Sequence, residues 1–384
     1  MSADFIGGLD ARDFLANTYG KKPAVFRGSL NSTLIGPAEM NDLFLQADCS
    51  NDDFKLAFGG RLVEKADYVE RYVHLGVERS RLKKHAVYDF LSKGATVIVN
   101  RIERCDKVAR LEQEISKLTG HRSLTSGYLA YRSMDSFKSH WDTRDIFVFQ
   151  FSGRKRWVIN EPTFRDPLYM QQSKDFEAVF SPPDNVYMDV TLEPGDMLYV
   201  PRGWWHNPSP VGEKTFHLTV GTYPPTGLDY VNWLMILLPQ VESVRRSLDN
   251  WEADKETVKD IAAALGNLAA SPSSYEQFMK SHHHKWGVQG RLSFDLMMDD
   301  DQPVSPLAML DVSPCLVVNS RTETATINDC TLSVAGTPGV VLGYLSSGVA
   351  RSMEDIYQLL APAGRSELSR VVRELVRHEA VYVR

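Results

Sequence analysis

The sequence is poor in cysteine and has no long apolar run. Its 384 residues include four cysteines, none of them in a Cys-x-x-Cys pair. That usage argues against a disulfide framework and against a cysteine zinc site. No stretch approaches the roughly 20 apolar residues needed to span a bilayer, and the first residues lack the basic start and apolar core of a secretory signal. We therefore expect a cytoplasmic protein with no membrane contact.

The chain also lacks an excess of positive charge. It has 43 lysines and arginines against 49 aspartates and glutamates, a net charge of -6. An acidic chain disfavours broad, charge-driven binding to nucleic acid. Hydrophobic residues at 43% and charged residues at 24% are ordinary for a globular protein, and the length suffices for two or three domains. Internal repeats and low-complexity segments are also missing.

Short strands dominate residues 126–225, after a mixed N-terminal region in which 107–119 has helical spacing and is closed by Gly120. The predicted strands are IFVFQF (146–151), RWVIN (156–160), VYMDVTL (186–192), MLYVP (197–201) and FHLTVGTY (216–223). Turn residues separate them, and Gly195 should supply a positive φ in one such turn. Strands at this spacing are typical of a β-barrel or sandwich.

Helices are expected beyond residue 225. The run at 228–248 is so apolar at its start that it must be buried, either in a core or between subunits. Residues 348–384 read helix, turn, helix, strand, the order of a small winged-helix-like module. Glutamates interleave the arginines of its last helix, which favours a structural or protein-contacting role over nucleic-acid binding. The tract His282-His283-His284 is interpreted as a surface loop, not a metal site.

The sharpest motif is SHWDTRDIFVFQF, in which His140 and Asp142 stand two apart. Residues i and i+2 of a strand point to the same side, so both can reach one ion. His206 follows the strand MLYVP and a tight turn, 64 residues beyond Asp142. Two histidines and one carboxylate on one face of an octahedron leave open positions, as in non-haem Fe(II) oxygenases. The pattern therefore predicts an iron site.

A basic residue, Lys155, lies in the hairpin after the His-x-Asp strand. There it could pair with the far carboxylate of 2-oxoglutarate, because a buried ammonium needs such an anion. The alternative is that Lys155 is a solvated member of the run Arg154-Lys155-Arg156. Arg144 and Arg202 are likewise either steering charges or solvated surface groups. The tryptophans at 157, 204 and 205 either line a peptide groove or pack in a core.

These segments together resemble the JmjC/cupin-type ribosomal oxygenases, the bacterial and eukaryotic ribosomal protein hydroxylases. The matching segments are NTYGKKPAVFRG (17–28), HWDTRDIFVFQFSGRKRWVIN (140–160), LEPGDMLYVPRGWWHNPSP (192–210) and FHLTVGTYPP (216–225). The resemblance implies an α+β fold with a double-stranded β-helix core. It further implies a helical dimerisation region and a C-terminal winged-helix domain. The expected boundaries are 1–225 for the oxygenase domain, with its barrel core at about 90–225, then 226–300 and 301–384.

The resemblance also implies roles for single residues. His140, Asp142 and His206 match the iron ligands, and Lys155 matches the basic residue that binds the C5 carboxylate of 2-oxoglutarate. This position is arginine in some bacterial members and lysine in eukaryotic ones.

Three further positions match contacts to the cosubstrate. His217 and Thr219 match polar positions on the last barrel strand that face it. Tyr131 falls near another polar contact, although YRSMDSFKS lacks the family's glycine-rich approach to the His-x-Asp motif. Because that approach borders the iron, this departure leaves the substrate open.

The leading hypothesis is an Fe(II)- and 2-oxoglutarate-dependent dioxygenase that uses O₂ to hydroxylate a side chain of a protein, perhaps a ribosomal protein, and that forms a homodimer. One alternative keeps the chemistry but gives it a peptide natural product or small molecule as substrate. Another is a non-catalytic cupin and winged-helix binding protein. The open metal positions argue against this last reading, since a binding module has no need of them.

Overall fold

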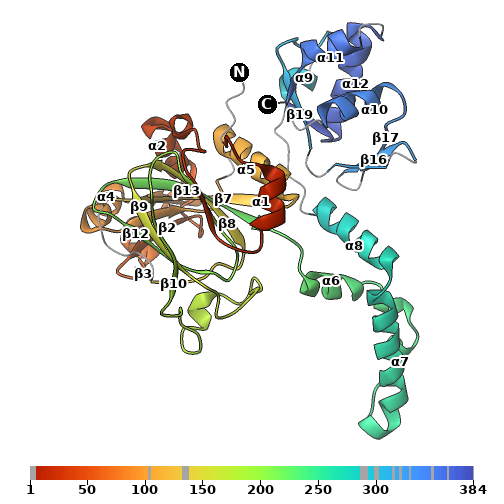
Figure 1. Cartoon of the computed structure of the whole chain (residues 1–384), viewed down its shortest axis with the longest axis horizontal. Coiled ribbons are helices and arrows are strands. Elements are labelled where there is room, and N and C mark those ends of the chain that lie inside the picture. The colour runs from red at the N-terminus through yellow and green to blue at the C-terminus, as the bar shows by residue number, and fades with distance from the viewer. Residues whose placement is uncertain are drawn as a thin grey trace. The chain divides into compact units, whose positions relative to one another are not determined.

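The computed structural model divides the chain into two compact units, Met1–Pro224 and Pro225–Arg384, both drawn in Figure 1. The first unit combines β-sheets with helices, and the second is mainly helical with a few short strands. The residues described are 6–102, 105–131, 138–285, 293–297, 302–313, 316–319, 322–327, 330–346, 350–360 and 363–383.

Two sheets form the barrel of the first unit. The larger has the order β1 (Ala24–Phe26), β11 (Met197–Val200), β8 (Asp145–Ser152), β13 (Thr215–Tyr223), β7 (Arg122–Ala130), β6 (Thr96–Val99), β2 (Phe54–Phe58), β3 (Arg61–Leu62). The smaller has the order β10 (Val186–Leu192), β9 (Lys155–Asn160), β12 (Trp205–Pro210). Ile146 and Val148 of the larger sheet share one buried cluster with Trp157 and Ile159 of the smaller, so the two sheets face each other.

The five strands predicted between 146 and 223 are all confirmed, as β8, β9, β10, β11 and β13. Gly195 has a φ of +101°, the left-handed conformation expected of it. Gly153 closes the β8–β9 hairpin at φ +63°, and a Cβ there would lie 1.9 Å from the carbonyl oxygen of Lys214. A glycine is therefore required where the chain turns toward Lys155.

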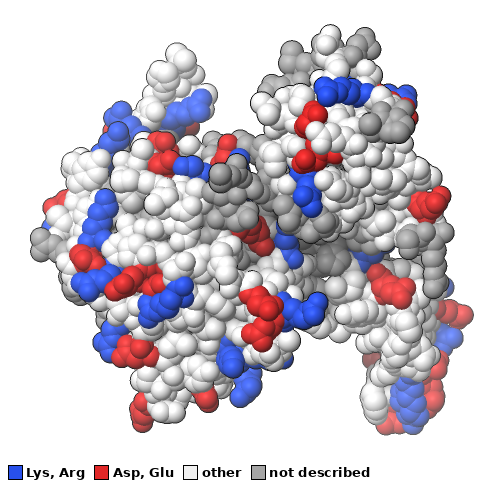
Figure 2. Space-filling model, turned by 45° about the horizontal axis from the view of Figure 1, so that its top comes forward, with Lys and Arg blue, Asp and Glu red and all other residues white. Residues whose placement is uncertain are grey.

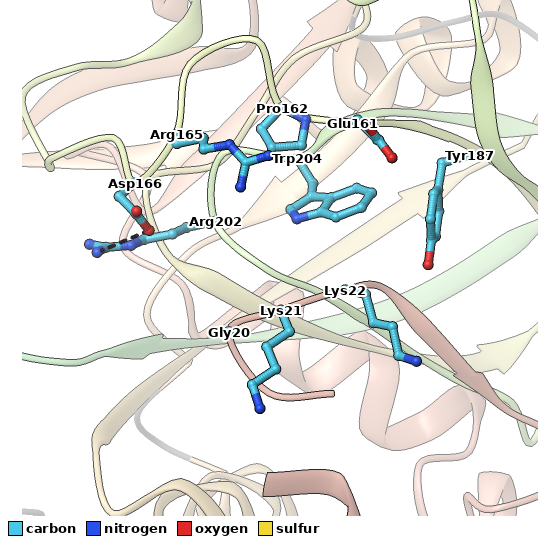
Figure 3. Close-up of a pocket in the computed structure, with 10 residues that line it drawn as sticks. All are labelled: Gly20, Lys21, Lys22, Glu161, Pro162, Arg165, Asp166, Tyr187, Arg202 and Trp204. Atoms are coloured by element: carbon cyan, nitrogen blue, oxygen red, sulfur yellow. Dashed lines mark ion pairs between the residues drawn. The ribbon is translucent and has the colours of Figure 1, made fainter. Parts of the chain in front are cut away.

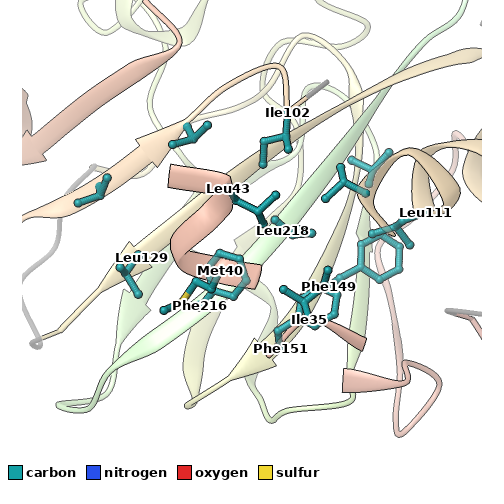
Figure 4. Close-up of a cluster of buried hydrophobic side chains, with 14 of the residues drawn as sticks. Ile35, Met40, Leu43, Ile102, Leu111, Leu129, Phe149, Phe151, Phe216 and Leu218 are labelled. Atoms are coloured by element: carbon teal, nitrogen blue, oxygen red, sulfur yellow. The ribbon is translucent and has the colours of Figure 1, made fainter. Parts of the chain in front are cut away.

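Helices cover the outer face of the larger sheet, as Figure 4 shows for part of this core. They are α1 (Ala11–Asn17), α2 (Pro37–Gln46), α4 (Lys84–Lys93) and α5 (Asp106–Thr119); α3 (Lys65–Tyr68) and the ribbon of β4 (Val69–His74) and β5 (Val77–Leu82) complete the unit. Val108, Leu111 and Ile115 of α5 are fully buried, and the helix ends at Gly120 as predicted. Each such side chain contributes roughly 2 kcal/mol by its burial.

The second unit holds a helical segment and a small mixed module. The helices of the segment are α6 (Gly227–Leu234), α7 (Trp251–Ala269), α8 (Pro272–Lys285) and α9 (Phe294–Met297). The module contains β14 (Met309–Val312), β15 (Val317–Asn319), β16 (Thr324–Ile327), β17 (Cys330–Ser333), α10 (Thr337–Leu345), β18 (Arg351–Ser352), α11 (Met353–Leu359), α12 (Arg365–Arg377) and β19 (Val381–Val383). Its final helix, turn, helix and strand have the predicted order, and Leu368, Val372 and Leu375 are buried.

Two expectations for this unit are corrected. The apolar run at 228–248 is not one buried helix, because α6 ends at Leu234 and only short 3₁₀ turns follow, one of them containing Pro239. Met235 and Ile236 are 57% and 68% exposed in this chain, so burial in its own core is excluded for them. Residues 282–284 lie in the last turn of α8 instead of in a loop. No described helix has the length and apolarity to cross a membrane.

Candidate metal centre

The structure brings His140, Asp142 and His206 together. His140 stands opposite His206 in an antiparallel bridge, with reciprocal backbone hydrogen bonds of 3.1 and 2.8 Å. Their ring centroids are 4.4 Å apart, and Nε2 of His206 lies 3.6 Å from Oδ2 of Asp142. One ligand atom from each of the three lies within 4.8 Å of the others. That spacing lets a single cation contact all three.

Neighbouring tryptophans fix the direction of these side chains. Because side chains alternate along an extended chain, Trp141 points away from the two ligands that flank it. It is 1% exposed, and its indole N–H donates to the carbonyl of Gln171 at 3.1 Å. Trp205 packs edge-on against it at 4.7 Å and donates to Oγ1 of Thr163 at 2.9 Å. The two indoles thus anchor the segments that carry His140, Asp142 and His206. Of the two alternatives left open for Trp205, packing in a core is the one that its 2% exposure supports.

Backbone carbonyls set the tautomers of both imidazoles. Nδ1 of His140 is 2.9 Å from the carbonyl oxygen of Lys138, and Nδ1 of His206 is 3.0 Å from that of Trp204. A proton on Nδ1 satisfies each contact and leaves the Nε2 lone pair for a metal. Gly203 donates its N–H to the carbonyl of Asp142 at 2.9 Å, which holds the backbone of the third ligand.

The electrostatics suit a divalent cation. Burial, with the neighbouring His140, lowers the pKa of His206 to about 4, so its imidazole is neutral near pH 7. Burial alone would raise the pKa of Asp142, but His206, Arg144 and His140 hold that pKa below its ordinary value. Two neutral imidazoles and one carboxylate are the donor set of non-haem Fe(II) sites. The residues present therefore fit a ferrous ion.

The low pKa of His206 makes the metal-free protein sensitive to acid. Its pKa falls from 6.5 to about 4 on folding, so below pH 6.5 the unfolded chain binds the extra proton and the folded state loses stability. The full shift corresponds to about 3 kcal/mol, lost as pH falls from 6.5 to 4. Urea unfolding of metal-free protein at pH 7 and pH 4.5 should show most of this loss. The His206→Gln variant should show a smaller change, and an equal change in both proteins would contradict the prediction.

Lys155 lies inside the barrel. It is 4% exposed, and strand alternation places it on the same face of β9 as Trp157 and Ile159. Ile159 pairs with His206, so Lys155 lies four residues along the strand from the metal centre, about 13 Å at 3.3 Å per residue. A five-carbon diacid bound at the metal can reach a lysine side chain over that span. The solvated interpretation is thus wrong for Lys155.

The flanking arginines of that run do stay at the surface. Arg154 pairs with Glu213 at 3.0 Å, and Arg156 pairs with Asp189 at 2.5 Å. All four side chains are at least 40% exposed. Burial thus separates Lys155 from its two neighbours in the sequence.

Unpaired polar atoms line the same interior. His217 stacks on Tyr128 with ring centroids 4.8 Å apart, and burial and the charge of Lys155 lower its pKa. Among the described residues, Nδ1 of His217, Nε1 of Trp157 and Oε1 of Gln150 are buried without a hydrogen-bond partner. Such atoms cost free energy unless a ligand or water satisfies them. These atoms would therefore suit a polar ligand.

Thr219 and Tyr131 differ in their surroundings. Thr219 pairs with Val148 and lies two residues from His217, so it shares the inward face of β13. Tyr131 follows β7, is 38% exposed, and lies beneath the ammonium of Lys214 at 5.6 Å. Its cosubstrate role stays a prediction.

One residue near the metal centre, Tyr128, was missed from the sequence. Tyr128 stacks on His217, and burial, with the charge of Asp142, raises its pKa to about 12. Side chains alternate between the two faces along β7 and β13, and that alternation could have indicated that Tyr128 shares the inward face with His217. Arg144 is half-buried, unlike a solvated charge, and donates to the hydroxyl of Tyr223 at 2.6 Å.

Comparison with known proteins agrees with this architecture. Residues 97–230 match the model of the JmjC domain family. Ribosomal oxygenase 2 of Rattus norvegicus is 28% identical over 218 residues, which cover 53% of this chain and 46% of that protein. A Drosophila persimilis protein named bifunctional lysine-specific demethylase and histidyl-hydroxylase NO66 is 35% identical over 126 residues, 32% of this chain and 17% of its own. The chain spans about half the length, or less, of these relatives.

Solved structures share the fold across the whole chain. The crystal structure of Escherichia coli ribosomal oxygenase YcfD superimposes with a TM-score of 0.58 at 17% identity and full coverage of both chains. A second structure of that protein, with a TM-score of 0.56, is a complex with cobalt and 2-oxoglutarate, again at 17% identity and over 98% of this chain and 99% of that one. Residues 97–230 therefore match the JmjC domain model by sequence, and the barrel that they belong to has the fold of these solved structures.

Proposed function

We propose that the protein is an Fe(II)- and 2-oxoglutarate-dependent dioxygenase that hydroxylates a side chain of a protein substrate, a ribosomal protein. The observation that carries this proposal is the geometry of the barrel. Two imidazoles and one carboxylate converge at one end, and a buried lysine lies about 13 Å further along the same interior. Few other chemistries need both a metal site with open coordination positions and a buried lysine inside the same barrel.

The residues divide the work between metal and cosubstrate. His140, Asp142 and His206 would hold the ferrous ion, with Nε2 of each imidazole turned toward it. When bound, iron with 2-oxoglutarate and O₂ supplies the oxidant for an unactivated C–H bond, with succinate and CO₂ as co-products. Lys155 would hold the distal carboxylate and so fix the orientation of the cosubstrate.

The lining polar atoms would complete the cosubstrate pocket. The unpaired indole N–H of Trp157 is a donor, and Nδ1 of His217 is one when it carries the ring proton, so a dicarboxylate could accept a hydrogen bond from each. Thr219, on the inward face of the same strand as His217, would add a hydroxyl. The aromatic wall of Trp157 and Tyr128 would keep bulk water from the reacting atoms.

The names of similar proteins support a protein substrate. Relatives that match about half of this chain are named ribosomal oxygenases, and others that match a shorter part are named histidyl-hydroxylases. The cobalt and 2-oxoglutarate complex belongs to a protein of the same fold. Both support the reaction class that the side chains of this chain suggest, and a cytoplasmic site of action follows from a ribosomal substrate.

The second unit would serve assembly and contacts with other proteins. We assign residues 226–300 to a homodimerisation region, since the 19-residue α7 has no buried residue in this chain and Trp251 is 67% exposed. Residues 301–384 would form a winged-helix-like module, with α10, α11 and α12 beside the sheet β18-β14-β19. A large exposed apolar area is typical of a surface that another subunit covers.

The substrate can be identified by intact-protein mass spectrometry. Ribosomal proteins from cells that contain the enzyme should include one that is heavier by a single oxygen than in cells lacking it. Re-expression of the wild-type chain should restore the mass, and the His140→Ala variant should not. Identical masses in all strains, with succinate formed only from a small metabolite, would assign the enzyme to a different substrate class.

A further inference from the structure

A second pocket, separate from the metal centre, opens at the same end of the barrel. It has a volume of about 330 Å³ and is shown in Figure 3. Its walls come from four segments, which are 20–22 before β1, 161–166 after β9, Tyr187 of β10, and 202–204 between β11 and β12. None of the three metal-binding candidates lines it. No motif in the sequence indicated this pocket.

The pocket is cationic in an acidic chain. Four basic side chains face two carboxylates, an excess of two positive charges; the basic ones are Lys21, Lys22, Arg165 and Arg202, and the acidic ones Glu161 and Asp166. Arg202 pairs with Asp166 at 3.5 Å, and Lys21 donates to the carbonyl of Ala16. Within the described part of the chain, Lys22 and Arg165 form no ion pair. Two cations therefore remain available for an anionic ligand.

The shape of the pocket favours a single anionic side chain over a nucleotide. Trp204 lies against Tyr187, with ring centroids 4.8 Å apart at 70°, and it is only 8% exposed. Most of its ring is therefore covered, and little of it is left for a nucleic-acid base to stack on. The face in Figure 2 mixes Lys and Arg with Asp and Glu and shows no continuous basic stripe for a phosphate backbone.

Short covalent and hydrogen-bonded links join this pocket to the metal centre. Trp204 is two residues from His206, at most about 7 Å of extended chain, and its carbonyl contacts Nδ1 of His206. Gly203, in the same turn, donates to the carbonyl of Asp142. A polypeptide that presents one side chain to the metal could thus place a nearby residue in the pocket.

We propose that this pocket binds an aspartate or glutamate side chain of the polypeptide substrate, a few residues from the one that is hydroxylated. The proposal rests on the proposed function for its choice of a polypeptide. Lys22 and Arg165 donate hydrogen bonds to the carboxylate. The pocket would then select which side chain of a substrate reaches the metal centre.

A displayed library of random peptides tests this proposal. The peptides are selected for binding to the whole chain in the presence of Mn²⁺ and 2-oxoglutarate. The wild type should enrich peptides with an acidic residue at one position. The double variant Lys22→Ala, Arg165→Ala should lose that position and bind an enriched acidic peptide about tenfold more weakly, within the range expected for two partly exposed charge pairs. Binding of that peptide to the wild type should also weaken with added salt.

Two control variants separate charge placement from charge number. Arg79→Ala, Lys280→Ala removes two exposed cations elsewhere and should keep the acidic preference. Lys22→Arg, Arg165→Lys should retain most of it. The proposal is overturned by selections that show no acidic position, by an unchanged preference in the double variant, or by an RNA oligonucleotide that needs Lys22 and Arg165 while peptides do not. Failure of the oxygenase proposal would appear separately, as absence of a metal- and 2-oxoglutarate-dependent visible band.

Discussion

Hydroxylation of the protein substrate is expected to fall by more than about 100-fold when His206 is replaced by alanine. His206 is 2% exposed and is one of the three proposed metal ligands. Loss of groups that merely orient a ligand already costs 10- to 100-fold in metal affinity or activity, so loss of the ligand itself should cost more. The loss of activity is measured at saturating 2-oxoglutarate, and the loss of metal affinity is measured by titration with Fe(II).

Alanine at an exposed histidine provides the matched control. His85 lies on α4 in the same unit, and its side chain is exposed. His85→Ala should keep wild-type activity and metal affinity, while melting temperatures of both metal-free variants report whether they fold. A folded His206→Ala protein that keeps more than a tenth of wild-type activity would remove this residue from the metal centre.

The Lys155→Met variant should raise the KM for 2-oxoglutarate by about 100-fold or more. Removing one partner of a buried charge pair costs about 2–5 kcal/mol, and each 1.4 kcal/mol is a factor of ten. The distal carboxylate is remote from the reacting carbon. Its ion pair with Lys155 should therefore stabilise the ground state and the transition state equally. The kcat at saturating 2-oxoglutarate should therefore change by only a few-fold.

Charge-preserving replacement distinguishes this role from packing. Lys155→Arg keeps the cation, so its KM should lie much nearer the wild-type value than that of Lys155→Met. The free energy of unfolding of each variant, measured without metal, shows whether a change in KM accompanies a change in fold. Equal KM values in wild type and Lys155→Met would exclude Lys155 from cosubstrate binding.

The sequence predicted the barrel strands and the clustering of His140, Asp142 and His206 because their signals are local. Alternating apolar strands and turn residues placed five strands correctly. The spacing of two between His140 and Asp142 fixes them on one face of an extended chain. His206 needed only the observation that a histidine follows a strand and a tight turn. In the structure, an antiparallel bridge pairs His140 with His206 and brings the three side chains together. No local sequence pattern specifies that pairing.

Other features depend on contacts between distant segments, and the sequence could not supply them. Lys155 stands between two arginines of identical charge, and only the closure of the barrel decides which of the three is buried. The second pocket draws on four segments that no motif links. The apolar run after residue 227 was wrongly expected to be one helix, because apolarity does not show where a helix ends, and α6 stops at Leu234, before the 3₁₀ turn that contains Pro239.

Anaerobic addition of Fe(II) and then 2-oxoglutarate to the purified protein tests the metal centre most directly. The wild type should develop a weak visible charge-transfer absorption that needs both components. The His140→Ala variant should show no such band under the same conditions. A wild-type spectrum identical to that of the variant would contradict the assignment of these three side chains to a ferrous site.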